Sequence, residues 1–315
     1  MATDPVYNAR IEAFEAGTIT ALVRTEVAKN LKFAYLFPKQ STDSKQITVT
    51  EELPSDIFES QIKGEKKMRN ITKGASPRKL RFQLQAESGM KFTENRIELD
   101  IENRDLANAK FDLMGIQSRI ARELAKDIDT DTLAAVKEYC GTINDSQIHG
   151  AWTTNTIEEI VSDIVRIRSK LRPLPYDVDT IAVGDEAQLQ VATKGSVLPA
   201  KWEFPSNGFT VDNTIQLGGS NIYWGGQVIE DDELFAFSSA NPGLEIFYLN
   251  YNNPRVKSVP SIGDYESYTP IINVMMYDNS DKEEDPITTL KYSYGVGFHP
   301  IEQGKRMLHM TDILA

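Results

Sequence analysis

The longest regular pattern of apolar residues runs from Asp105 to Tyr139. Its apolar side chains recur mostly at steps of three and four residues: Leu106, Ala109, Leu113, Ile116, Ile120, Leu124, Ile128, Ala135 and Tyr139. Charged residues lie between them, and no proline interrupts the run. This spacing predicts one amphipathic α-helix with Asp105 at its N-cap. At 1.5 Å per residue such a helix is roughly 50 Å long, which indicates an elongated or plate-like subunit.

Three further segments carry helical patterns. Thr18 is expected to cap a helix that continues to Leu31, before Pro38. Thr156 and Glu159 have the spacing of a capping box and are expected to open a helix that ends before Pro173. A shorter helix is expected to begin near Asp185.

Strand patterns fill most of the remaining chain. Between Gln46 and Ile101, apolar and polar residues alternate in three places, which predicts extended arms around a loop. These places are Ile47 and Val49, then Leu80, Phe82 and Leu84, then Ile97, Leu99 and Ile101. Further strands are expected at Asp179–Val183, Ile222–Trp224, Val228–Ile229, Leu234–Phe237, Leu244–Leu249, Ile271–Met276 and Thr288–Phe298. Helices and strands together predict an α+β fold.

Composition narrows the classes of protein that fit. The 315 residues are 40% hydrophobic and 25% charged, which is typical of a folded domain. No apolar run is long enough for a membrane span, and the first residues lack the pattern of a secretory signal. Cys140 is the only cysteine, so the chain cannot form an internal disulfide framework, and we expect an intracellular origin. The net charge of -12 argues against general affinity for nucleic acid, which requires cationic side chains.

One segment reverses this charge. Between Lys63 and Arg81 there are eight basic residues against the single acid Glu65, a local charge of about +7. The basic residues are Lys63, Lys66, Lys67, Arg69, Lys73, Arg78, Lys79 and Arg81. We interpret them as an electrostatic contact with an acidic surface of another copy of the chain. A solvated loop is the simpler alternative, and nucleic-acid contact is a third, weakened by the lack of aromatic residues for base stacking.

The sequence contains no recognisable catalytic motif. Its three histidines, His149, His299 and His309, form no zinc-binding pair, and neither a nucleophile elbow nor a phosphate-binding loop is present. Asp127, Asp129, Asp131 and Glu138 match acidic positions of a calcium loop, but Thr132 replaces the required glycine. We therefore interpret these acids as a solvated helix face, and Cys140 as a buried or neutral thiol. We expect Gly218, Gly219, Gly225 and Gly226 to form turns. No enzymatic activity, cofactor or metal is predicted.

The order of these parts resembles the Hong Kong 97-type major capsid proteins of tailed double-stranded DNA viruses of bacteria or archaea. The residues that carry the likeness are Gln46–Ile101, Asp105–Tyr139, Asp179–Lys194 and Leu290–Leu314. The resemblance implies an N-arm with the first helix (1–45), an extended β loop (46–101) and a spine helix with peripheral domain (102–155). It further implies an α/β axial domain (156–285) and a C-terminal return to the peripheral domain (286–315).

The resemblance also implies a function. The chain would assemble with itself into pentamers and hexamers of an icosahedral shell that encloses double-stranded DNA, which it would contact only weakly. Scaffold, portal and decoration proteins would be further partners, with no membrane involved. The protein would be part of a virion assembled in the host cytoplasm. Encapsulins, which are shells around a cargo enzyme, share this fold and are the alternative.

Overall fold

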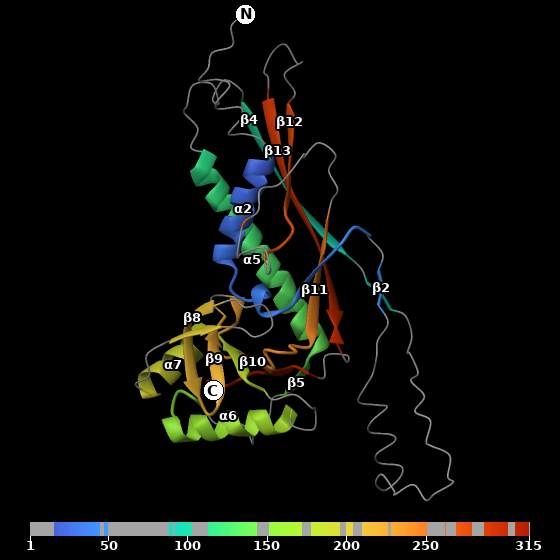
Figure 1. Cartoon of the computed structure of the whole chain (residues 1–315). Coiled ribbons are helices and arrows are strands. Elements are labelled where there is room, and N and C mark those ends of the chain that lie inside the picture. Colours follow the sequence, from blue (N-terminus) through green and yellow to red (C-terminus); the bar gives the residue numbers. More distant parts are fainter. Residues whose placement is uncertain are drawn as a thin grey trace, which may run out of the picture.

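A computed structural model shows an elongated molecule with a long upper part and a more compact lower part (Figure 1). The structure describes residues 16–44, 47–49, 88–90, 92–102, 113–143, 151–171, 178–195, 200–203, 210–225, 228–250, 262, 269–278, 287–301 and 306–314. Within these ranges the strands form a five-stranded sheet, a seven-stranded sheet and a two-stranded ribbon.

The five-stranded sheet is built around β13 (Ile287–Pro300). Its other strands are β1 (Lys39–Thr42), β4 (Thr93–Glu102), β11 (Leu244–Leu249) and β12 (Asn273–Asp278). β13 pairs antiparallel with β4 over ten residues, from Ile287↔Glu102 to Val296↔Thr93. It also pairs antiparallel with β12 and, nearer its C-terminal end, with β11. β1 adds to β11 in parallel.

Two helices pack against this sheet, α2 (Ala16–Asn30) and α5 (Leu113–Tyr139). The helix predicted up to Tyr139 is confirmed over 27 residues of α5, about 40 Å; the expected cap at Asp105 lies outside the described residues. Leu124 and Ile128 of its apolar stripe are fully buried. The expectation for Thr18 is wrong, because α2 already begins at Ala16 and Thr18 lies inside it.

Polar contacts fix the position of α5 on the sheet. Gln117 exchanges hydrogen bonds with the Tyr292 hydroxyl at 2.7 and 2.9 Å. The Tyr294 hydroxyl donates to Asp131 at 3.2 Å, and both accept from the Asn95 amide. Gln117, Tyr292 and Tyr294 are buried, so these hydrogen bonds are needed to satisfy their polar groups and they favour one register of the helix on β4 and β13.

The seven-stranded sheet forms the lower part in Figure 1. Its order is β5-β14-β10-β6-β9-β8-β7. The strands are β5 (Gly141–Ile143), β6 (Thr180–Val183), β7 (Ala200–Glu203), β8 (Thr210–Leu217), β9 (Ser220–Trp224), β10 (Leu234–Phe237) and β14 (Leu308–Met310). Helices α6 (Ile157–Leu171) and α7 (Asp185–Gly195) bury their apolar sides against one face in a core of their own.

The predicted capping box at the start of α6 is confirmed. The Thr156 backbone N–H donates to the Glu159 carboxylate at 2.7 Å, and the Glu159 N–H donates to the Thr156 hydroxyl at 3.4 Å. The turn predicted at Gly218 and Gly219 is also confirmed, because both glycines have positive φ and join β8 to β9.

The strand predictions hold in most places. The one at Val228–Ile229 is wrong, since these residues form a turn in which Ile229 is buried without sheet pairing. Leu80, Phe82 and Leu84 lie outside the described residues. The sheets also combine strands from different expected segments: β11 and β12, from 156–285, pair with β13, whereas β14 lies beside β10.

The two parts of the molecule share one continuous core. The short turn η1 (Ala34–Leu36) lies at their junction and is flanked by Phe33 and Phe37. Phe33 contacts Phe235 with ring centroids 5.8 Å apart, and Phe37 contacts Phe237 at 5.4 Å. The second face of the seven-stranded sheet therefore packs onto the same apolar cluster that holds α2 and α5.

Candidate assembly surface

The two-stranded ribbon formed by β2 (Ile47–Val49) and β3 (Ser88–Met90) is the base of the predicted extended loop. Its register pairs Ile47 with Met90 and Val49 with Ser88. Residues 50–87, including all eight basic residues predicted as a contact, lie outside the described residues. The structure thus pairs the two strands from which the extended loop begins and ends (Figure 1), and the role of the basic side chains stays a prediction.

The outward face of β4, on the side of the sheet away from α5, carries an acidic stripe. We give this name to Glu94, Glu98, Asp100 and Glu102, which alternate with the inward-facing Ile97, Leu99 and Ile101. Two cations lie on the same face: Arg96 pairs with Glu94 at 2.8 Å, and Lys291 pairs with Glu98. Four carboxylates against two cations leave the stripe acidic. The strand prediction rested on Ile97, Leu99 and Ile101 alone; the acids that alternate with them are the sequence signal from which the stripe could have been predicted.

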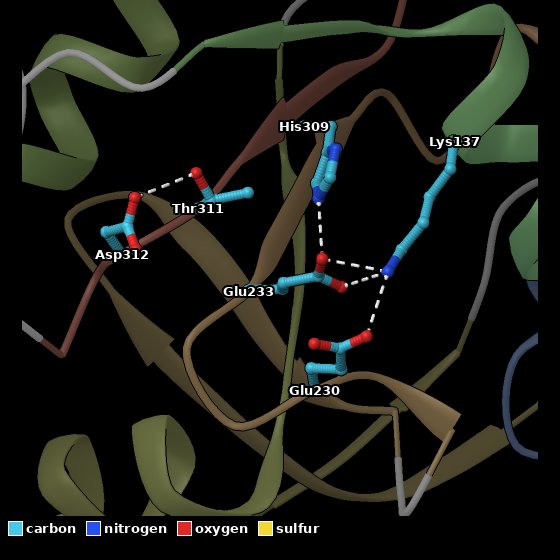
Figure 2. Close-up of polar contacts among 6 residues, drawn as sticks. All are labelled: Lys137, Glu230, Glu233, His309, Thr311 and Asp312. Atoms are coloured by element: carbon cyan, nitrogen blue, oxygen red, sulfur yellow. Dashed lines mark hydrogen bonds and ion pairs between the residues drawn. The ribbon is translucent and has the colours of Figure 1, made fainter.

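A cluster of charged side chains lies where α5 meets the seven-stranded sheet (Figure 2). Lys137, in the last turn of α5, contacts Glu233 at 2.7 Å and Glu230 at 3.5 Å. His309, on β14, points at the same Glu233 carboxylate with Nε2 3.3 Å from Oε1, and its ring stacks on Phe235. These contacts join α5 to the turn before β10, and the same turn to β14.

The pKa shifts in this cluster follow from its burial. Burial lowers the pKa of His309 below its usual value, and the neighbouring Glu233 offsets part of this effect. For Lys137, burial also acts to lower the pKa, but Glu233 and Glu230 outweigh it and raise the pKa overall. His309 is therefore mainly a neutral packing group at pH 7, while Lys137 stays charged.

Cys140, next to this cluster, is not an activated nucleophile. Its side chain is buried, and burial raises the pKa of the thiol to about 12. The expectation of a buried, neutral thiol is confirmed. A nucleophilic cysteine would need the opposite shift, toward the thiolate.

The calcium-like run of acids lies within α5. Asp129 is only 1% exposed, so the expectation of a solvated helix face is wrong for this residue. Its carboxylate accepts the backbone N–H groups of Lys32, Phe33 and Ala34 at 2.7 to 3.0 Å and thereby holds the turn that joins the two parts. Across the described residues, no three side chains of the His, Cys, Asp or Glu types gather in a way that could hold a metal ion.

The two histidines in the described part of the chain, His299 and His309, lie in different sheets. His299 is buried near the end of β13, as expected for a strand-end residue. In the strand register it lies opposite Glu245 of β11. His309 lies in the charged cluster, and His149 lies outside the described residues. None of the helices in the described part of the chain has the length and apolar character needed to cross a bilayer.

Sequence comparison gives no relative: no family model matches the chain, and no curated protein matches it. Comparison with solved structures gives many matches. A virus-like particle from Pyrococcus furiosus superposes with a TM-score of 0.55 at 9% identity, covering 93% of this chain and 97% of that one. The capsid of cyanophage P-SCSP1u gives 0.54 at 9% identity, covering 88% and 86%.

An encapsulin, SrpI from Synechococcus elongatus, gives a TM-score of 0.53 at 10% identity over 88% of this chain and 85% of that chain. These structures are a virus-like particle, a phage capsid and an encapsulin, and the likeness runs through nearly the whole chain. The protein therefore has an α+β fold of the Hong Kong 97 type, as its sequence predicted.

Proposed function

We propose that this protein is a structural subunit that assembles with copies of itself into a closed shell. The observation that supports this most directly is the fold, shared over about nine-tenths of the chain with viral capsid and encapsulin shells. A shell requires flat subunits with several interfaces and arms that overlap neighbours. The elongated sheet, with a two-stranded ribbon at its side, provides both.

Within the shell, we propose that the basic segment Lys63–Arg81 lies on the acidic stripe of a neighbouring subunit. The segment carries about +7 and the stripe excess negative charge, so the two surfaces are complementary. Opposite charges of this kind select the partner and the register more than they add affinity. The rest of the acidic chain repels nucleic acid and suits a wall that packaged DNA touches only weakly.

The content of the shell distinguishes two versions of this function. We propose a virion shell around double-stranded DNA, built from pentamers and hexamers in the host cytoplasm with the help of scaffold, portal and decoration proteins. The match to the SrpI encapsulin supports a second candidate, a compartment around a cargo enzyme. Particles purified from cells decide between them: nuclease-protected DNA supports the first, and a stoichiometric co-purified protein supports the second.

Charge reversal tests the contact between copies. Changing Lys66, Lys67 and Arg69 to Glu should reduce the sedimenting, assembled fraction while circular dichroism and the melting temperature of the subunit stay unchanged. The matched control replaces Lys66 and Lys67 by Arg and Arg69 by Lys, which keeps the charge and should keep assembly. Changing Glu98, Asp100 and Glu102 to Lys in the reversed variant should restore it. Normal shells from the first variant would contradict the electrostatic contact.

A further inference from the structure

Gly297 occupies an unusual position in the longest strand of the molecule. It lies inside β13, where glycine is disfavoured by about 0.5 to 1 kcal/mol relative to alanine. Its backbone is not in the left-handed region, so flexibility of φ does not explain the residue. A glycine inside a strand otherwise marks a place where another segment approaches closely.

The approaching segment is the end of the ribbon. A Cβ atom placed on Gly297 would lie 2.7 Å from Met90 Sδ, 3.0 Å from Phe92 Cε1 and 3.2 Å from Met90 Cγ. All three distances are shorter than ordinary carbon contacts of 3.5 to 4.0 Å. Both side chains therefore occupy the space that a side chain at position 297 would need.

The topology explains why the close approach falls here. β4 is paired with β13 up to Thr93↔Val296, so the pairing stops one residue before Gly297. The inward-facing residues Tyr292, Tyr294 and Val296 are buried in the core, so Gly297 faces outward, like the acidic stripe. On the N-terminal side of Thr93 the chain no longer pairs with β13. Phe92 and Met90 lie against Gly297 there, and β3 pairs with β2.

We propose that the β2–β3 ribbon packs on Gly297, and that the contact of Met90 and Phe92 with this glycine sets the direction in which the ribbon extends from the five-stranded sheet. The inference rests on the proposed function, in which residues 50–87, which connect the two ribbon strands in the sequence, would reach the neighbouring copy. A side chain at position 297 would lift the ribbon off the sheet. The loop of one subunit would then miss its site on the next.

The first test measures ribbon direction in the unassembled subunit. Spin labels on Thr48→Cys in β2 and Arg96→Cys in β4, in a Cys140→Ala background, report the distance between ribbon and body by pulsed electron resonance. The parent should give one narrow distribution. Gly297→Val should shift or broaden it, and Met90→Ala added to that variant should return it toward the parent, because the smaller side chain frees the space.

Thr289→Val is the matched control, since it places the same side chain at another outward position of β13, away from the ribbon. It should leave the distribution unchanged. If Gly297→Val does not fold, the smaller Gly297→Ala replaces it in the same measurement. An unchanged distribution in the folded Gly297 variant would overturn the proposal.

Assembly gives the second readout. Gly297→Val should lower the association constant of the subunits at least about tenfold relative to wild type, with recovery in the Met90→Ala double variant. Normal assembly by Gly297→Val would also overturn the proposal. Failure of the wild-type chain to assemble would instead contradict the proposed function, while the spin-label distances would still decide the role of Gly297.

Discussion

Asp129 shows how a single side chain joins the two parts of the molecule. Its carboxylate is buried in α5 and accepts three backbone N–H groups from the turn that follows α2. No sequence pattern reveals this role, because its partners lie about a hundred residues earlier in the chain. The spacing of acids along the helix predicted solvent exposure, because the sequence does not show that the turn containing Phe33 packs over Asp129.

Removing this carboxylate should destabilise the subunit strongly. In Asp129→Ala, three buried donors lose their acceptor, and at about 1 to 3 kcal/mol for each unsatisfied group the free energy of unfolding should fall by roughly 3 kcal/mol or more. Asp129→Asn keeps one acceptor oxygen and should lose less. Urea unfolding of the unassembled subunit measures both variants. Asp127→Asn, on the exposed side of the same helix, is the control, and equal losses at 127 and 129 would contradict the assignment.

The pH dependence of stability should separate Asp129 from His309. Burial, partly offset by the backbone N–H donors, raises the pKa of Asp129 to about 6, so its stabilising contribution is complete below about pH 4 and is lost as the pH rises through 6. Burial lowers the pKa of His309, so its contribution is present above about pH 6.5 and is lost on acidification.

Difference curves against wild type isolate the two groups. Urea unfolding from pH 4.5 to 7 should show Asp129→Asn falling further below wild type at the acidic end. His309→Gln should instead gain on wild type as the pH decreases, because glutamine takes up no proton. Parallel curves for either variant would show that the group has the same pKa in the folded and unfolded chain.

At the level of single elements, the sequence was most informative where one period persists. The stripes of α5 and α6 and the alternation along β4 and β13 each continue over many residues, so single exceptions do not hide them. Short strands lacked this advantage. β1 is the polar sequence Lys-Gln-Ser-Thr, which has no strand pattern of its own. It forms a strand because it pairs in parallel with the edge of β11.

The capping box of α6 gives a prediction at the scale of one helix. Thr156→Ala removes the acceptor for the Glu159 N–H and should cost about 1 kcal/mol of unfolding free energy. Adding Glu159→Ala should then cost less than it does in wild type, because the two side chains act as one unit. Ser162→Ala, at an exposed position of the same helix, is the control. Strict additivity of the two losses would contradict the reciprocal cap.

For the whole molecule, the sequence predicted the type of fold, and the expected division of the chain into segments stays a prediction. The order of arm, long loop, long helix, second α/β unit and returning strand was sufficient for the fold. The pairing of strands that lie far apart in the sequence, such as β14 with β5 and β10, was not predicted. Such long-range pairing depends on which strand edges are available in the folded molecule, and the local sequence pattern of a strand does not predict its partner.

Copies of this chain are proposed to close into a shell. Electron microscopy of the full-length protein expressed alone, after fractionation by sedimentation across a range of concentrations, tests it most directly. We expect uniform closed particles, or pentamers and hexamers of the same subunit, in the fast-sedimenting fractions. A protein that remains monomeric at every concentration, with its fold intact, would contradict it.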